Sequence, residues 1–344
     1  MKSNKRLKIN LTDLVPIVAF IVILLVFSLW SIKDGKVRML TANNLSTIIE
    51  QAMQTIVVAS GTIFVVALGC VDMSVGVNLA LSGVIGALIA YSLNIGWLMI
   101  PVAMVVGFIV GVFNGVMTSK FKISSFMQTI AMLIGVRGLV NYIQALPAVG
   151  TMSLPSSLSF LNKFAVKFPI FLVILVIMAY LFEFSRFGRN CRAIGENETA
   201  AKFVGIPVDK VKVLAFGVSG LMAGVGSIFS IVTVGSTSMQ MGVFLEMKVL
   251  MAIFLGGVLV TGGSSAKFYK ILLGSLSIQI IINGLAIVGK SDVYISQTVE
   301  GILLLLVLFL SVYLGERQQH GRADVDEEPP GGITQKADSA AETA

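Results

Sequence analysis

Residues 96–117 read GWLMIPVAMVVGFIVGVFNGVM, an uninterrupted stretch without a charged side chain. An α-helix over this stretch would cross the roughly 30 Å of hydrocarbon in a bilayer, which takes about 20 predominantly apolar residues. Similar segments recur along the whole chain, and we count ten: 14–32, 45–69, 75–91, 96–117, 124–145, 168–184, 211–234, 244–260, 268–288 and 295–314. The sequence therefore predicts an all-α fold, a polytopic membrane helical bundle of about ten transmembrane helices.

The composition of the chain excludes several classes of protein. Of its 344 residues, 56% are hydrophobic and 12% are charged, whereas soluble domains carry about 25% charged residues. A water-soluble globular enzyme is therefore excluded. The chain has two cysteines and one histidine, too few for a disulfide framework, a Cys/His zinc site or a histidine-based nucleophile relay. We expect no catalytic residues, no metal site and no cofactor bound by this chain.

The distribution of lysine and arginine predicts the orientation. Ten spans place both termini on one side, and most of the 25 lysines and arginines fall there, which the positive-inside rule identifies as the cytoplasm. The first span resembles a signal peptide, but its apolar core is longer than usual and no small-residue cleavage site follows. We therefore expect a cytoplasmic N-terminus over 1–13, a transmembrane domain over 14–314, and a disordered cytoplasmic tail over 315–344, which is acidic and poor in apolar residues.

One motif points to nucleotide binding, and we reject it. Residues 284–291 read GLAIVGKS, which matches the phosphate-binding pattern G-x-x-x-x-G-K-[ST]. That loop works by aiming backbone N–H groups at phosphates, between a strand and a helix. Here the first residues end an apolar span, and the rest fall on the side opposite the termini, where ATP is absent. We expect a span followed by a short exterior turn.

The longest loop on the side of the termini lies at 185–210. Asn197 is a suitable N-cap with Glu198 in the first turn, Gly205 suits the position after the helix, and Pro207 follows as a stop. These start and stop signals predict a helix of about two turns. Its apolar side would consist of Ala200, Ala201, Phe203 and Val204. Such a helix is shorter than the roughly 12 to 15 residues that are marginal alone in water. It needs a surface to dock on, either the chain's own membrane domain or a partner protein.

The loop and several other stretches carry a family pattern. They read FGR at 187–189, AIGENETAA at 193–201, GI at 205–206, GCVDMSVG at 69–76, LGG at 255–257 and NG at 283–284. From residue 44 to about 312, the chain resembles the permease subunits of bacterial ABC importers for ribose, xylose, arabinose and galactosides, which are related to the branched-chain amino-acid permeases. Cys70, Lys248 and the segment 264–267 depart from the family pattern, and the sugar stays open.

The resemblance implies a function and a set of partners. The chain would form the translocation path of an ATP-driven importer in the bacterial inner membrane, with a ribose-like monosaccharide as its solute and no nucleic acid as partner. Its partners would be a cytoplasmic ABC ATPase that binds ATP and Mg²⁺, an extracytoplasmic sugar-binding protein, and a second permease subunit, identical or related. The loop at 185–210 would be the coupling loop, which contacts the ATPase through Gly188, Arg189, Gly195, Asn197, Glu198, Ala200, Ala201, Lys202 and Gly205.

Polar residues inside the spans are candidates for the translocation path, because a charge at the bilayer centre costs roughly 2.5 to 3.5 kcal/mol. The path candidates are Asp72, Asn114, Arg137, Asn141, Glu246 and Asn283. For Asp72 an N-cap role with Ser74 is the simpler interpretation, and Glu246 with Lys248 is equally explained by snorkelling to the outer interface. Arg137 lies near the middle of its span and should face the bundle or a water path. The amides either line an aqueous route or join helices by hydrogen bonds.

Glycine spacing predicts where helices pack closely. Gly107, Gly111 and Gly115 recur every fourth residue in one span, and Gly220 and Gly224 do so in another. Small residues at this spacing create flat helix faces on which another helix can approach. The pattern is structural and does not identify a solute.

Two other function classes stay open. An ABC permease for another small polar solute, such as a branched-chain amino acid, a nucleoside or autoinducer-2, would share the same features. An ion-coupled secondary transporter would place a titratable acid near the midplane, whereas the acids here cluster toward the ends of the expected spans. Adjacent genes for an ATPase and for a binding protein with a signal peptide would favour the importer.

Overall fold

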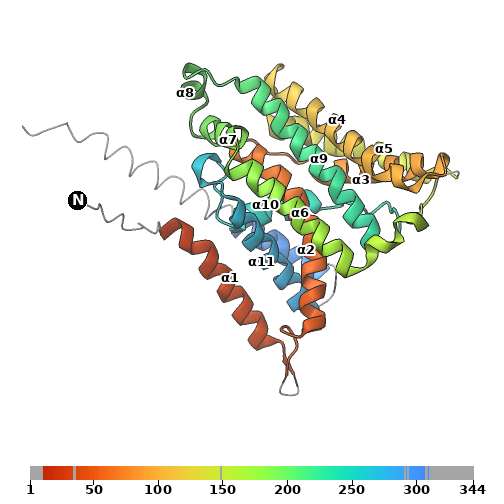
Figure 1. The fold of residues 1–344 in the computed structure, drawn as a ribbon. Helices are drawn as coiled ribbons and strands as arrows, with labels where there is room; N and C mark the ends of the chain where they lie inside the picture. Colours follow the sequence, from red (N-terminus) through yellow and green to blue (C-terminus); the bar gives the residue numbers. More distant parts are fainter. Residues whose placement is uncertain are drawn as a thin grey trace, which may run out of the picture.

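The computed structural model describes residues 11–33, 36–147, 149–289, 292, 294–306 and 309. The described residues form a bundle of helices with a β-hairpin at one end, whose two strands have two residues each (Figure 1). The elements are α1 (Leu11–Trp30), β1 (Ile32–Lys33), β2 (Lys36–Val37), α2 (Ala42–Ala67), α3 (Val75–Ser92), η1 (Gly96–Leu98), α4 (Met99–Ser119), α5 (Ser125–Ala145), η2 (Ser156–Asn162), α6 (Phe164–Glu183), α7 (Arg186–Glu196), α8 (Glu198–Phe203), α9 (Val208–Val234), α10 (Leu245–Leu255), η3 (Gly263–Ser265) and α11 (Phe268–Ile287). The predicted helical membrane bundle is confirmed.

Seven helices among the described residues are long and apolar enough to cross a membrane. They are α2, α3, η1 with α4, α5, α6, α9 and α11. The other three expected spans are also helical but shorter, at Pro16–Trp30 within α1, at α10 and at Tyr294–Leu306. The expectation of a span over 244–260 is therefore corrected, because α10 ends at Leu255. Residues 1–10 of the expected N-terminal segment 1–13, and the whole expected tail over 315–344, lie outside the described residues.

Helix α9 is the centre of the bundle and is buried along most of its length, between α2, α3 and α4. It meets α4 through glycines. A Cβ atom on Gly107 would lie 2.3 Å from the carbonyl oxygen of Gly220, and one on Gly220 would lie 2.1 Å from that of Gly107. Since any side chain would separate these backbones, the predicted flat faces are confirmed, and they pack on each other.

Helices α2 and α10 end in the same way. Each is followed by a glycine in the left-handed region, Gly69 at φ +72° and Gly257 at φ +84°, which closes a helix at no steric cost. The segments that follow the two helices meet, because a Cβ atom on Gly262 would lie 2.7 Å from the backbone nitrogen of Gly69. Of the two helices, α2 with 26 residues is long enough to cross a membrane and α10 with 11 is not.

The two ends of the bundle differ. Helices α7 and α8 lie at one end, which we call the α8 end, and the β1–β2 hairpin lies at the other, the hairpin end (Figure 1). Helix α1 runs along an edge, where it packs on α11. The two ends define the direction along which a solute would cross.

Candidate functional site

Helix α8 begins and ends as predicted. The Asn197 side-chain oxygen accepts a hydrogen bond from the backbone N–H of Ala200 at 2.9 Å, which is the N-cap geometry. Gly205 follows the helix with φ +82°. The helix itself spans Glu198–Phe203, slightly under two turns. The predicted loop helix is confirmed.

Glu198 holds α8 against α9. Its Oε1 accepts a hydrogen bond from Lys202 Nζ, and its Oε2 accepts one from Lys212 Nζ on α9, both at 2.7 Å. These two ammonium groups lower the pKa of Glu198 from its ordinary 4.5 to about 2. The carboxylate is therefore ionised throughout the physiological range, and α8 is fixed to the first turns of α9.

The apolar side of α8 is divided between two environments. Ala201 is 3% exposed and packs into its own subunit, whereas Phe203 is 87% and Val204 76% exposed. The chain's own membrane domain thus covers one part of the helix. The other part is not covered by any residue that the structure describes. An exposed apolar pair beside charged groups is typical of a partner surface.

The other predicted coupling residues divide in the same way. Exposed at the surface are Arg189, Asn197, Ala200, Lys202 and Gly205. Gly188 and Gly195 instead pack inside the subunit, where a Cβ atom would lie 2.0 Å from the carbonyl oxygens of Phe182 and Ala67 respectively. Their role in the structure is close packing of α7 on the membrane domain.

Helix α7 is a difference from the sequence prediction, because 185–210 is expected to be a loop with one short helix and Arg186–Glu196 is helical. Ser185 caps it, because its Oγ accepts a hydrogen bond from the backbone N–H of Gly188 at 3.1 Å. Arg192 pairs with Glu183 of α6 at 2.7 Å and lies 5.0 Å over the ring of Phe182. Cys191 and other apolar side chains face inward. The signal was present in this serine cap and in the amphipathic spacing, but arginines dominate the segment.

A polar cavity of about 350 Å³ lies between α2, α10 and α11. Amide, hydroxyl and charged side chains alternate with apolar ones along its wall. The lining residues are Glu50, Gln51, Gln54, Thr55, Thr233, Gly242, Val243, Leu245, Lys248, Gln279 and Ile282. Gln279 donates a hydrogen bond from its Nε2 to Gln51 Oε1, so amides of α11 and α2 meet across the cavity.

The charges at this cavity are paired. Lys167 of α6, which is 4% exposed, lies 3.3 Å from Glu50 and donates a hydrogen bond to Thr233 at 3.3 Å. Lys248 lies 3.4 Å from Glu300. Paired charges together with amides suit a neutral hydroxylated solute better than an ion, because amides both donate and accept hydrogen bonds.

The predicted path residues lie elsewhere, since none of the six is among the described lining residues. Asp72 is buried, and its Oδ1 accepts hydrogen bonds from the N–H and Oγ of Ser74 at 3.0 and 2.7 Å. Its Oδ2 accepts one from Ser219 Oγ of α9 at 3.0 Å. Asn114 joins this network by donating to Ser74 Oγ at 2.8 Å. The N-cap residue of α3 is Ser74 rather than Asp72, and Asp72 supports this helix start through its hydrogen bonds to the backbone and hydroxyl of Ser74.

Arg137 faces the bundle, as expected, and donates a hydrogen bond to the carbonyl oxygen of Met241 at 2.9 Å. Glu246 is 6% exposed, and a Cβ atom on Gly76 would lie against its carboxylate. The snorkelling interpretation of Glu246 is therefore wrong, because α10 begins inside the bundle. Of the remaining path candidates, Asn283 is buried and Asn141 is exposed.

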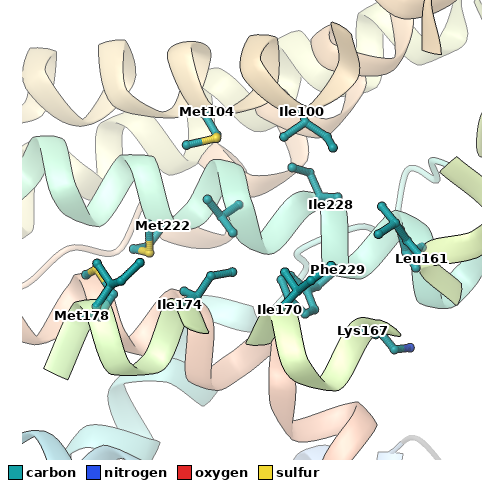
Figure 2. Close-up of a pocket in the computed structure, with 13 residues that line it drawn as sticks. Ile100, Met104, Leu161, Lys167, Ile170, Ile174, Met178, Met222, Ile228 and Phe229 are labelled. Atoms are coloured by element: carbon teal, nitrogen blue, oxygen red, sulfur yellow. The ribbon is translucent and has the colours of Figure 1, made fainter. Parts of the chain in front are cut away.

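A second cavity, of about 320 Å³, is an apolar groove between α4, α6 and α9 (Figure 2). Ile100 and Met104 of α4 point into it, as do Ile174 and Met178 of α6. Among the described residues that line it, Lys167 is the only polar one. Apolar walls cannot replace the water around a hydroxylated solute, so this groove is no candidate for a sugar path.

The phosphate-loop match starts inside a helix. Its residues from Gly284 to Ile287 belong to α11, and Gly284 packs against the ring of Phe27 in α1. Lys290 and Ser291 lie outside the described residues. Within the described part of the chain, no group of three or more His, Cys, Asp and Glu side chains could hold a metal ion.

Comparisons with known proteins complete the description of the site. The family model described as branched-chain amino acid transport system, permease component, matches residues 44–310. The chain is 27% identical to the ribose import permease protein RbsC of Escherichia coli (strain K12) over 285 residues, which is 78% of this chain and 86% of that protein.

Two other relatives are similar over most of their length. The L-arabinose transport system permease protein AraH of Escherichia coli (strain K12) is 31% identical over 259 residues, 74% of this chain and 78% of that protein. The autoinducer 2 import system permease protein LsrC of Escherichia coli O157:H7 is 29% identical over 308 residues, 85% of each chain. No solved structure matches the chain.

Proposed function

This chain belongs to the family of permease components of branched-chain amino acid transport systems, and on that premise we propose that it carries a ribose-like monosaccharide across the membrane. It acts as the permease subunit of an ATP-driven importer in a bacterial inner membrane. A separate cytoplasmic ABC ATPase binds ATP and Mg²⁺, an extracytoplasmic sugar-binding protein delivers the solute, and a second permease subunit completes the path. The α8 end faces the cytoplasm.

The polar cavity supports a sugar as the solute. Gln51, Gln54 and Gln279 can donate and accept hydrogen bonds, and two nearby threonines add hydroxyl groups. A monosaccharide loses hydrogen bonds to water when it enters a membrane, so it needs such replacements. Relatives named for ribose and L-arabinose import agree with this solute class. The relative named for autoinducer 2 import makes that molecule the second candidate.

The observation that carries ATPase coupling is the exposed pair Phe203 and Val204 at the tip of α8. Burying an apolar side chain of this size contributes roughly 1.5 to 3 kcal/mol, and both side chains are exposed in the isolated subunit. Glu198 holds the helix so that the pair projects from a fixed support. A partner with an apolar groove can therefore bind α8 without first ordering it.

Two substitutions at one position test this coupling. Phe203→Asp places a charge in the apolar contact, at a cost of several kcal/mol, and should lower recovery of the cognate ATPase with the purified subunit by about two orders of magnitude. Phe203→Leu keeps the contact apolar and should retain the ATPase. Ala201 is unsuitable for this test, because it is buried within the subunit.

The measurements are co-purification of the ATPase and uptake of labelled ribose by cells that lack their own importer. Loss of both with Phe203→Asp, together with a wild-type amount of subunit in the membrane, supports the proposal. Wild-type recovery of ATPase with Phe203→Asp would remove α8 from the docking surface. No uptake of ribose by the complete wild-type complex would reject ribose, and uptake of autoinducer 2 would then select the second candidate.

A further inference from the structure

Glu196, the last residue of α7, reaches a different part of the chain. Its Oε1 accepts a hydrogen bond from the backbone N–H of Ser264 at 2.7 Å and another from the Ser264 hydroxyl. Ser264 is the middle residue of η3, which connects α10 to α11. Hydrogen bonds to an ionised carboxylate are shorter and stronger than neutral ones. Glu196 therefore attaches α7 to the connection between two cavity-lining helices.

The preceding residue, Gly195, is tightly packed at the same contact between α7 and η3. A Cβ atom at Gly195 would lie 2.0 Å from the carbonyl oxygen of Ala67 and 2.7 Å from the backbone nitrogen of Gly263. The last turn of α7 thus touches the end of α2 and η3 at once. Because packed backbones are hardly compressible, η3 must follow when α7 moves toward it.

The connection from α10 to α11 is itself braced. Lys270, in the first turn of α11, donates hydrogen bonds from Nζ to the carbonyl oxygens of Gly257 and Ser265, both at 2.9 Å. The hydroxyl of Ser265 also accepts a hydrogen bond from the backbone N–H of Leu259 at 3.0 Å. A displacement applied at η3 is therefore passed to the end of α10.

The start of α10, by contrast, is anchored on α3, because a Cβ atom on Gly242 would lie 2.1 Å from the carbonyl oxygen of Gly76, and its backbone angles suit a pivot. Gly242 has φ +69°, and Phe244 has φ +59° although it is not glycine. A bulky residue in this region is strained, and hinges are short segments that absorb large φ/ψ changes. Helix α10 has only 11 residues and carries Lys248 on the cavity wall. A shift at its far end would swing Lys248 relative to α2.

We propose that Glu196 is the positioning residue through which α8 controls the polar cavity. When the ATPase displaces α7 and α8, Glu196 draws η3 with them, and α10 turns about Gly242–Phe244 and changes the cavity. This inference rests on the proposed function, and it adds the element that joins docking to solute movement. An ATPase can shift the cavity only if the two are linked by an element with two arrangements, and the hinged α10 is that element.

Three variants test the link in the complete complex with its ATPase. Glu196→Ala removes the acceptor, and ribose uptake should fall at least about tenfold, the scale of losing hydrogen bonds to a charged group. Glu196→Gln keeps an oxygen acceptor in place and should retain more uptake than the alanine variant. Asp209→Ala is the matched control, because Asp209 is an exposed acid at the same end that pairs with Lys122, and its uptake should equal wild type.

A second readout separates coupling from a general structural defect. ATPase recovery and basal ATP hydrolysis should stay at wild-type levels in Glu196→Ala. Gln54→Cys, in a background with Cys70→Ala and Cys191→Ala, reports on the cavity by its rate of reaction with a water-soluble maleimide. With Glu196 present, ATP should change this rate severalfold. With Glu196→Ala, ATP should leave the rate unchanged.

The outcomes distinguish this inference from the proposed function. Normal uptake and an ATP-dependent maleimide rate in Glu196→Ala would overturn the role of Glu196 while leaving the importer in place. Failure of the wild type to bind its ATPase would overturn the proposed function instead. Should Glu196→Ala not reach the membrane, Ser264→Ala, which removes only the hydroxyl donor, decides the question. Reduced uptake with bound ATPase then supports the link, and wild-type uptake rejects it.

Discussion

Ser219 of α9 donates a hydrogen bond to the buried carboxylate of Asp72 at 3.0 Å. Asp72 lies in the break between α2 and α3, so this bond attaches the break to the central helix of the bundle. Asp72 also accepts two hydrogen bonds from Ser74, which starts α3. The carboxylate therefore joins the α2–α3 connection, the start of α3 and α9, a structural role that agrees with the simpler of the two interpretations of Asp72 from the sequence.

We expect Asp72→Ala to destabilise the subunit by about 2 to 3 kcal/mol, because it removes the buried acceptor that takes three hydrogen bonds from Ser74 and Ser219. Ser219→Ala should cost about 1 to 2 kcal/mol by the same reasoning. Ser92→Ala, at an exposed helix end, is the control and should stay within about 0.5 kcal/mol. Thermal unfolding in detergent measures all three. Equal stability of the Asp72 and Ser92 variants would contradict the structural role.

Two glycine-to-alanine substitutions should distinguish a glycine at a close helix contact from a glycine at an open helix surface. Gly107→Ala forces its Cβ atom against the carbonyl oxygen of Gly220, and overpacking of this kind typically costs about 1 to 3 kcal/mol. Gly135→Ala on α5 has no atom within 4 Å of its Cβ position and should be neutral or stabilise by up to about 1 kcal/mol. The measurement is again thermal unfolding. A similar loss in both variants would argue against direct contact of α4 and α9.

The cavity and the sequence-derived path candidates predict different transport phenotypes. Gln54→Ala removes a cavity amide, and loss of a solute hydrogen bond should raise the KM for ribose about 3- to 10-fold. Asn141→Ala changes an exposed path candidate outside the cavity and should leave KM unchanged. Initial rates of uptake over a range of ribose concentrations provide the test. The reverse ranking would favour a path along α5.

Acid should leave α8 attached over a wide range. The pKa of Glu198 is lowered from 4.5 to about 2 by its two lysine partners. A lowered folded-state pKa gives stability that is present above about 4.5 and is lost as the pH falls toward 2. ATPase recovery should therefore show no Glu198-dependent change between pH 8 and pH 5. Glu198→Gln should weaken recovery modestly and equally at both pH values, because surface pairs contribute at most about 1 kcal/mol.

Reporter fusions test the orientation. A reporter that is active only in the cytoplasm should give signal when fused after residue 314 and none when fused after residue 288, because the positive-inside rule places the termini in the cytoplasm. Signal from the second fusion would contradict the orientation that places α8 beside the ATPase. A fusion after residue 204 would then locate α8 directly.

Features that depend on neighbouring residues or on regular spacing are predicted correctly from the sequence. The cap at Asn197, the left-handed Gly205 and the glycine faces of α4 and α9 all follow from neighbouring residues or fixed spacing. The short α10 is not predicted from the sequence, because the run 244–260 is apolar apart from Glu246 and Lys248, and hydropathy does not show where a helix ends within such a run. Helix α7 was missed because an arginine-rich segment gives the same hydropathy whether it is a loop or a surface helix.

The sequence by itself determined the membrane class, the ten helical segments and the family, because apolar length and local motifs are properties of contiguous residues. Only the tertiary structure decided which polar side chains meet. Gln51 and Gln279 are far apart in the sequence but adjacent across the cavity, and Glu196 meets Ser264. The physical reason is that apolar residues surround most of each spanning helix, so the sequence carries little amphipathic contrast to indicate which face turns inward. Helix rotation is then settled by contacts between distant segments.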